Sequence, residues 1–320
     1  MKILVVSGFL GAGKTTFISH LIKTSRLTPV ILENEYGNDS LDSKTITKNT
    51  KDIEVLEFME GCVCCSKKDS FINSLLAIHA SLAPEYLIVE PSGIGKLSNI
   101  IENINKITFG DIELLNPVLV LSINQIDTYI KEYSDIYIDQ IRNAGTIVFS
   151  KIENESIENI EQAKKKILKY NPDAEIIDTP YQYEDKLFFE NLMDHRNETE
   201  LVKSETMSIS NIKQETFINP NLKNINQLIS ILESTLRNQF GNIVRAKGEI
   251  MIGDERIRFD LADGKYSIIS TDNDNSDCHC VFIGKDINKN LLSNYLNVRN
   301  KKIDLVNFNR KTSFEQLSYR

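Results

Sequence analysis

Near the start of the chain, residues Gly8–Thr16 read GFLGAGKTT and match the phosphate-binding pattern G-x-x-x-x-G-K-[ST]. The apolar run Ile3–Val6 precedes them directly, as a short buried strand would, and a helical segment over Thr15–Lys23 follows. In this strand–loop–helix setting, glycines let the loop curl so that backbone N–H groups and the helix N-terminus face one phosphate cluster. The pattern predicts a nucleoside triphosphate bound at the end of the first strand of a parallel sheet. The loop residues expected to contact the nucleotide are Gly8, Gly11, Ala12, Gly13, Lys14, Thr15 and Thr16.

Side chains of this loop and of a later motif predict a magnesium site. Lys14 is expected to reach the β- and γ-phosphates, and the Thr15 hydroxyl to bind Mg²⁺. The strand-like run 85–90 ends in the motif EPSG, where Glu90 and Gly93 have the spacing of an acidic-x-x-Gly switch. Glu90 is expected to hold the same Mg²⁺ through water, and the Gly93 N–H to sense the γ-phosphate. Lys14 and Glu90 are the predicted catalytic residues; no Gln occupies an obvious water-positioning place.

A loop for recognising the base is predicted after a later strand. The run Thr146–Phe149 leads into Ser150, Lys151, Ile152 and Glu153, which resemble the [NST]-K-x-D loop that reads guanine in GTPases. In that loop the carboxylate accepts hydrogen bonds from the guanine edge while the Lys stem packs on the ring. Because Glu153 replaces the usual Asp, one additional methylene has to be accommodated. The pattern favours GTP over ATP, with Ser150, Lys151 and Glu153 as nucleotide-binding residues.

Strand-length apolar runs alternate with helix-length segments through the first half of the chain, which predicts a mostly parallel sheet covered on both faces. The expected strands are Ile3–Ser7, Pro29–Leu32, Ile53–Phe58, Tyr86–Val89, Val118–Ile123 and Thr146–Phe149. The expected covering helices are Ser66–Ala80, Asp135–Asn143 and Ile157–Lys169.

Beyond about Asp185 the chain becomes polar and irregular, which predicts a linker and a second domain. The expected division is a P-loop domain over 1–190, a linker over 191–205 and a smaller α+β domain over 206–320. Asp263-Gly264 is a hairpin turn signal inside that second domain. Its expected strands are Met207–Phe217, Ile243–Ile252, Arg256–Leu261, Tyr266–Ser270 and His279–Ile283, with helices over Asn221–Asn238 and Lys285–Asn294.

Composition narrows the class of protein. The chain has 41% hydrophobic and 26% charged residues, which is typical of a globular protein. Its net charge of −8 argues against nucleic acid or an anionic membrane as a partner. No apolar stretch reaches the length of a membrane span, and because an apolar strand is predicted near the start, no signal peptide is expected. Five cysteines, three of them within four positions, do not resemble a secreted disulfide framework, so a cytoplasmic location is expected.

The cysteine cluster GCVCC predicts a transition-metal site. Cys62, Cys64 and Cys65 lie between the predicted strand 53–58 and the helix expected from residue 66. Thiolates so close together suit Zn²⁺, Co²⁺ or Cu⁺, and a helix N-terminus near Cys65 favours its thiolate form. This segment cannot fill a four-ligand shell alone, and an incomplete shell suits a transferable metal. Buried packing cysteines and a redox pair are the alternatives.

Further ligands are sought among acidic residues and in a second Cys/His group. Glu35, in the motif ENEYG after the second strand, is the preferred candidate, and Asp39 and Asp42 are weaker ones. Cys278-His279-Cys280 at the start of a later strand is another possible metal contact, although such cysteines more often serve packing.

Taken together, these motifs resemble the CobW-type metallochaperone GTPases of the CobW/HypB/UreG group. The resemblance rests on GFLGAGKTT, ENEYG, GCVCC and EPSG, and extends into the second domain through GNIVRAKG (241–248) and VFIG (281–284). It implies a GTPase that uses GTP and Mg²⁺, binds Zn²⁺ or Co²⁺ at the Cys-x-Cys-Cys motif, and passes the metal to a client metalloprotein or a metal-cofactor biosynthesis enzyme. The chain lacks the histidine-rich loop of many members, which leaves the cysteine motif as the principal metal site.

Other functions remain open at this stage. A nickel-insertion GTPase would bind Ni²⁺ in preference to Zn²⁺. A small-molecule phosphotransferase would need an arginine-rich lid, whereas only Arg26 and Arg142 precede the linker. A nucleotide-gated module with redox-active thiols would oxidise without binding metal. The sequence allows either a monomer or a homodimer.

Overall fold

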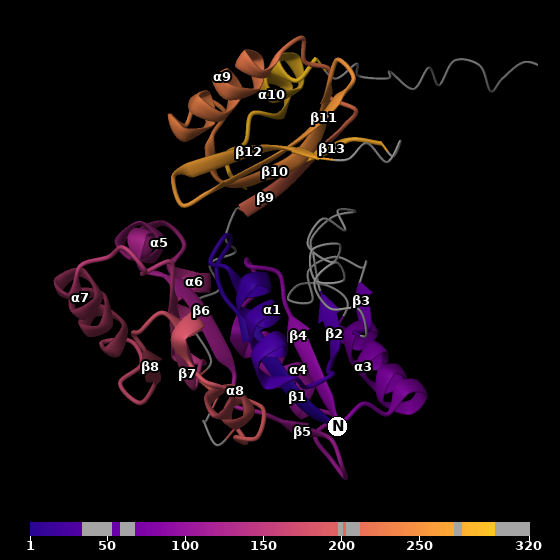
Figure 1. Cartoon of the computed structure of the whole chain (residues 1–320), viewed down its shortest axis with the longest axis vertical. Helices are drawn as coiled ribbons and strands as arrows, with labels where there is room; N and C mark the ends of the chain where they lie inside the picture. The colour runs from indigo at the N-terminus through magenta and orange to yellow at the C-terminus, as the bar shows by residue number, and fades with distance from the viewer. Residues whose placement is uncertain (34–52, 58–67, 198–200, 203–211, 272–276, 298–320) are drawn as a thin grey trace, which may run out of the picture.

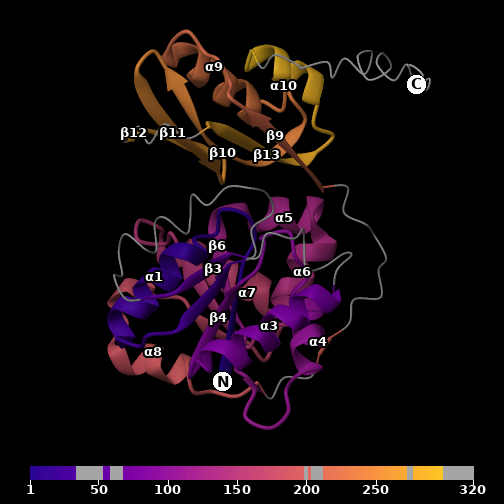
Figure 2. The same cartoon turned by 90° about the vertical axis from the view of Figure 1, so that its right-hand side faces the viewer.

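The computed structural model describes residues 1–33, 53–57, 68–197, 201–202, 212–271 and 277–297 of the 320-residue chain. These residues form two sheets, one in each half of the chain, which are stacked one above the other in Figures 1 and 2. No helix within them is long and apolar enough to cross a membrane.

The first sheet is parallel, as the alternation of strands and helices predicts. Its strands lie in the order β3-β2-β4-β1-β6-β7-β8, and the short β5 pairs with β1. This order brings the ends of β1, β2 and β4 together at one edge, where the sequence motifs lie. The strands are β1 (Lys2–Ser7), β2 (Val30–Glu33), β3 (Val55–Glu57), β4 (Tyr86–Glu90), β5 (Glu113–Leu114), β6 (Val118–Ser122), β7 (Thr146–Ser150) and β8 (Glu175–Ile177).

Helices cover both faces of this sheet (Figure 1). Because successive residues of β1 point to opposite faces, Ile3 and Val5 join one core cluster while Leu4 and Val6 join another. The first cluster takes its helical residues from α3 (Lys68–Leu82), α4 (Leu97–Asn105), α5 (Ile126–Glu132), α6 (Ser134–Arg142) and α7 (Ile157–Leu168). The second takes them from α1 (Lys14–Ser25) and α8 (Lys186–Leu192).

Helix α8 corrects the expectation that the chain is irregular from Asp185 onward. Asp185 caps the helix by accepting a hydrogen bond from the Phe188 N–H at 3.0 Å. Phe189 is fully buried and packs against Phe17 of α1, with ring centroids 6.0 Å apart. The polar run that predicts a linker begins only after this helix, at Asp194, and the buried residues of α8 complete the core of the first domain. The boundaries of the linker at 191–205 stay a prediction.

The second sheet is antiparallel, in the order β12-β11-β10-β13-β9. The Asp263-Gly264 turn joins β11 to β12, and both residues have left-handed φ angles, +52° and +72°, as the sequence signal predicts. The elements are β9 (Ile212–Ile218), α9 (Ile225–Leu236), β10 (Asn242–Ile252), β11 (Glu255–Ala262), β12 (Lys265–Thr271), β13 (His279–Lys285) and α10 (Lys289–Tyr295). Helices α9 and α10 lie on the side of this sheet away from the first domain (Figures 1 and 2).

The two faces of the second sheet differ in chemistry. Ala246 and Ile250 of β10, with Phe259 of β11, belong to the core beneath α9 and α10. On β10 and β11 most of the alternating residues on the other side are charged, and this face turns toward the first domain. The domains also share apolar contacts, since Val281 and Ile283 of β13 belong to the same core cluster as the α5 residue Tyr129.

Candidate nucleotide-binding site

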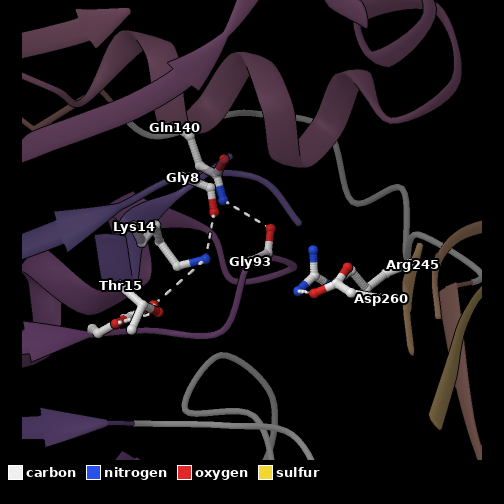
Figure 3. Close-up of polar contacts among 8 residues, drawn as sticks. Gly8, Lys14, Thr15, Gly93, Gln140, Arg245 and Asp260 are labelled. Carbon is white, nitrogen blue, oxygen red and sulfur yellow. Dashed lines mark hydrogen bonds and ion pairs between the residues drawn. The ribbon is translucent and has the colours of Figure 1, made fainter. Parts of the chain in front are cut away.

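The phosphate loop connects β1, which ends at Ser7, to α1, which begins at Lys14. Gly11 and Gly13 have φ angles of +77° and +96°, a backbone region that residues with a Cβ seldom adopt. The Lys14 ammonium donates a hydrogen bond to the Gly8 carbonyl at 3.3 Å, so this side chain folds back over the loop (Figure 3). The loop therefore offers a concave surface with a cation beside it, which suits a phosphate group.

The predicted magnesium residues lie together. The Thr15 hydroxyl donates to the Glu90 carboxylate, with oxygen distances of 3.0 and 3.2 Å, and the Lys14 ammonium lies 4.0 Å from the same carboxylate. Glu90 is positioned by β4, which pairs with β1 and so ends beside the phosphate loop. A hydroxyl and a carboxylate are oxygen donors that suit Mg²⁺, so the residues present fit this ion.

Glu33 is a site residue that the sequence analysis missed. It ends β2 directly beside Glu90 in the sheet register, is only 4% exposed, and lines the same cavity as Thr15 and Glu90. It is the first residue of the ENEYG motif, in which the sequence analysis preferred Glu35. Its place at the carboxyl end of a strand was the available signal.

Gly93 lies directly against the phosphate loop, as a γ-phosphate sensor requires. A Cβ at position 93 would come within 2.7 Å of the Leu10 nitrogen, so only glycine allows this approach. The fully buried Gln140 of α6 donates its amide to the carbonyls of Gly93 and Gly95, at 3.2 and 2.8 Å (Figure 3). Gln140, which the sequence analysis does not predict as a site residue, thus holds this loop by its backbone carbonyls.

The predicted base-reading loop is joined to the phosphate loop by two hydrogen bonds. The Ser150 hydroxyl donates to the Ala12 carbonyl at 2.6 Å, and the Lys151 ammonium donates to the Gly11 carbonyl at 2.7 Å. Glu153 lies farther along the loop, is exposed, and accepts a hydrogen bond from Gln182 at 2.9 Å. Ser150 and Lys151 therefore meet the phosphate loop, while the Glu153 carboxylate is accessible from solvent.

A cavity of about 690 Å³ extends from this loop to the second domain. Its walls in the first domain include Gly13, Lys14, Thr15, Thr16, Glu90 and Gly93. The charged face of the second sheet supplies the opposite wall, with Arg245, Lys247, Arg258, Asp260 and Lys265. In Figure 3, Arg245 and Asp260 project from the second domain toward the loop that carries Gly93.

His20 and three tyrosines near this region have shifted pKa values. Burial lowers the pKa of His20, which lines the cavity, below the ordinary histidine value, and nearby Lys23 contributes in the same direction. Burial raises the pKa of Tyr129, Tyr133 and Tyr137, so these phenols remain neutral. Of the three, Tyr129 donates a hydrogen bond, to the Asp263 carboxylate at 3.0 Å.

The predicted transition-metal ligands lie outside the described residues. This applies to Cys62, Cys64, Cys65 and Glu35, and to the weaker candidates Asp39 and Asp42. The cysteine segment joins the end of β3 to the start of α3. In the described part of the chain, no group of three or more His, Cys, Asp or Glu side chains could hold a metal ion.

Cys278-His279-Cys280 accordingly does not form a metal cluster with other described residues. Cys278 is 3% exposed, and Cys280 is fully buried among the residues beneath α9 and α10. The strand places His279 on the face opposite Cys280, so the three side chains cannot converge. Burial of both cysteines is what the packing alternative expects.

The parallel sheet, the phosphate loop and the Thr15–Glu90 pair define a nucleotide-binding protein of the P-loop class. Residues 2–178 match the family model "CobW/HypB/UreG, nucleotide-binding domain", which covers more than half of the chain. The chain belongs to this family, and the resemblance noted in its sequence is confirmed.

Several characterised proteins are similar to this chain. The zinc-regulated GTPase metalloprotein activator 1 of Schizosaccharomyces pombe is 28% identical over 189 residues, which span 57% of this chain and 46% of that protein. The zinc chaperone YjiA of Escherichia coli is 28% identical over 158 residues, or 48% of this chain and 46% of YjiA. The chain thus spans about half the length of these curated relatives. The crystal structure of the Zn(II)-bound E. coli YjiA GTPase covers 93% of this chain and 99% of its own, with 16% identity and a TM-score of 0.44.

Proposed function

We propose that this protein binds GTP with Mg²⁺, hydrolyses it, and uses the cycle to deliver Zn²⁺ or Co²⁺ to a client metalloprotein or a metal-cofactor biosynthesis enzyme. The observation that carries the proposal is the 3.0 Å contact between Thr15 and Glu90 beside Lys14, within a domain of this family. The names of the relatives, a zinc-regulated GTPase activator and a zinc chaperone, support the metal part of the proposal.

In this mechanism the phosphate loop and Lys14 bind the triphosphate, and Thr15 and Glu90 hold Mg²⁺. The ion, when bound, withdraws negative charge from the phosphate oxygens. Water attacks the γ-phosphorus, and the bond from that phosphorus to the oxygen bridging to the β-phosphate breaks. The products are GDP, inorganic phosphate and one proton, which passes to solvent. Gly93 lies against Leu10 of the phosphate loop, and its N–H is proposed to respond to the loss of the γ-phosphate.

The base is proposed to be guanine, read by Ser150, Lys151 and Glu153. The bonds of Ser150 and Lys151 to the phosphate loop support a nucleotide contact for this segment. The exposed Glu153 carboxylate has room to turn toward a base, and its bond to Gln182 would then be exchanged.

The transition metal is proposed to bind Cys62, Cys64, Cys65 and Glu35. The segments that carry these residues follow β3 and β2, two neighbouring strands whose ends lie at the same edge of the sheet as Glu90. Nucleotide state and metal affinity are proposed to be coupled through these segments. A cytoplasmic location, expected from the cysteine usage of the sequence, is part of this proposal.

The test is a Zn²⁺ and Co²⁺ titration of the full chain with GTP–Mg²⁺, with GDP–Mg²⁺ and without nucleotide. It is repeated on Cys64→Ala/Cys65→Ala and on the control Cys278→Ala, which changes a cysteine outside the cluster. We expect metal affinity to depend on the nucleotide in the wild type and the control, and to fall in the double variant. The proposal would be refuted if the metal affinity changed neither with the nucleotide nor with the loss of the two thiols.

Two alternatives have observable signatures. A nickel-insertion GTPase would bind Ni²⁺ better than Zn²⁺ at equal free concentration. A phosphotransferase gains one argument from the structure, because Arg245 and Arg258 of the second domain line the cavity and supply the arginines that the first domain lacks. Release of the γ-phosphate as inorganic phosphate, with no phosphorylated acceptor, distinguishes hydrolysis from transfer. Monomer and homodimer are separated by the mass of the protein in solution, with and without metal.

A further inference from the structure

The second domain presents a cation-rich face to the phosphate loop. Strict alternation places Arg245 and Lys247 of β10, and Arg256 and Arg258 of β11, on the face opposite α9 and α10. Among the described residues that line the cavity, seven are lysine or arginine and three are carboxylates. The cavity is therefore positive although the whole chain carries a net charge of −8, and an anionic ligand is expected there.

Among the described cations of the second domain, Arg245 is the one that the structure places against Gly11 of the phosphate loop. A Cβ built on Gly11 would lie 3.0 Å from its Nη1 atom, so the guanidinium lies directly over the loop. Its side chain is only 16% exposed, and Nη2 donates to Asp260 at 2.8 Å. Asp260 itself is 40% exposed, so the ion pair lies at the solvent side of the cavity rather than deep in the interface.

An arginine in this place suits a phosphate chain. The guanidinium remains charged at any physiological pH, and its planar fork can donate hydrogen bonds to two oxygens at once. A triphosphate seated on the loop would compete with Asp260 for these donors, and its higher charge favours the exchange. During hydrolysis the breaking bond leaves additional negative charge on the β-phosphate, which a fixed cation stabilises.

We propose that Arg245 is a catalytic residue that contacts the phosphate chain of the bound nucleotide from the second domain and stabilises the charge that develops during hydrolysis. The inference rests on the proposed GTP hydrolysis and extends it, since it makes the second domain part of the nucleotide site. The first domain alone would then bind nucleotide through its loop but lack one charge-stabilising group.

The test compares four variants of the full chain: Arg245→Ala, Arg245→Lys, Asp260→Asn and the control Arg237→Ala, which removes an exposed cation at the end of α9. Steady-state GTP hydrolysis gives kcat and KM, and fluorescence titration gives the affinity for GDP, for a non-hydrolysable GTP analogue and for GDP with aluminium fluoride. Thermal unfolding and circular dichroism check that each variant is folded.

We expect Arg245→Ala to lower kcat about 10²- to 10³-fold, with a smaller change in GDP affinity and a large loss of affinity for the aluminium fluoride complex. Arg245→Lys should recover part of the rate, since it keeps the charge and loses the fork. Asp260→Asn should bind the GTP analogue more tightly than the wild type, because it removes a competitor and a negative charge. Arg237→Ala should behave as the wild type.

A kcat of Arg245→Ala within twofold of the wild type overturns the inference. Equal losses in Arg245→Ala and Asp260→Asn overturn it too, because they mean that the ion pair matters only for structure. If the wild type itself does not hydrolyse GTP, the proposed hydrolysis fails. In that case, equal affinity of the wild type and Arg245→Ala for the triphosphate analogue also removes the phosphate contact.

Discussion

The Lys151 ammonium lies 2.6 Å from the Asp263 carboxylate and 2.7 Å from the Gly11 carbonyl, and so joins the second domain to the phosphate loop. Asp263 is largely buried, with its side chain 6% exposed, and its second oxygen accepts the Tyr129 hydroxyl at 3.0 Å. The hairpin turn between β11 and β12 is therefore held by two residues of the first domain. One of them is Lys151, the lysine predicted to contact the base. Its Nζ atom therefore takes part in both the domain contact and the candidate nucleotide site.

Asp263→Asn is expected to weaken domain contact while keeping the turn, because Asn tolerates the left-handed φ angle and can still accept from Tyr129. Loss of the charge should lower the free energy of unfolding by about 1 kcal/mol, since the Lys151 partner is partly solvated. Urea denaturation measures this change. The control is Asp254→Asn in the exposed turn between β10 and β11, which should change stability far less. Equal effects at both turns would contradict the importance of the Lys151 contact.

Gly11→Ala is expected to disturb both the loop and the domain contact. The residue has a φ angle of +77°, and its new Cβ would come within 2.5 Å of the Ala262 Cβ. Gly110→Ala is a matched control, since Gly110 has a φ angle of +65° with nothing within 4 Å of a Cβ. The control isolates the backbone cost of about 1–2 kcal/mol. Gly11→Ala should exceed it by about 1–3 kcal/mol, the usual cost of overpacking, in urea denaturation. Similar losses of unfolding free energy for the two variants would show that the β11–β12 hairpin moves away from the new side chain at little cost.

Glu90→Gln is expected to weaken Mg²⁺ binding in the presence of GTP by about 10- to 100-fold, the usual cost of losing a group that holds a metal through its water. Nucleotide affinity measured without Mg²⁺ should change much less. Glu158→Gln, on the exposed surface of α7, serves as the control. The measurement is a Mg²⁺ titration of the fluorescence of a labelled GTP analogue. An unchanged Mg²⁺ midpoint would remove Glu90 from the metal site.

His20 should make the nucleotide-free protein less stable at acidic pH. Burial lowers its folded-state pKa below the ordinary value of 6.5, so the unfolded state takes up a proton that the folded state resists. The associated stability is present above pH 6.5 and is lost as the pH falls below it. The melting temperature of His20→Gln should therefore fall less than that of the wild type when the pH is lowered from 7.5 to 5.5. His195→Gln, at an exposed histidine, should match the wild type. Parallel losses in all three proteins would refute this role.

Most strands of both domains, and helices such as α6, α7 and α9, are predicted from the sequence to within a few residues because hydrophobic period and turn residues agree there. Strand β4 and the Asp263-Gly264 turn are examples, since each carries its own local signal. Helices α4 and α5 and strand β8 are not among the expected elements. The two-residue strand β5 was missed because it has no pattern of its own and exists by pairing with β1. Helix α8 is not predicted for a related reason, since Phe189 is buried through contacts with residues distant in the sequence, such as Phe17 of α1.

Only those residues of the candidate site that belong to a sequence motif can be predicted from the sequence. Thr15 and Glu90 are 75 residues apart in the chain, yet each belongs to a recognisable pattern, and the structure brings them into contact. Gln140 has no such pattern, because its role depends on the carbonyls of a loop from another element. The sequence alternation places Arg245 and Lys247 on one face of β10. The sequence does not show that this face lies against the phosphate loop of the first domain.

The contact between Ala262 and Gly11 limits how far the two domains can diverge independently in evolution. The Cβ of Ala262 lies where a side chain at position 11 would have to go, so neither residue can grow without displacing the other. The loop cannot move away to make room, because its shape is dictated by the phosphates that it is built to hold. The second domain is therefore not an interchangeable module, and a replacement hairpin would have to carry a small residue at this position to be accepted.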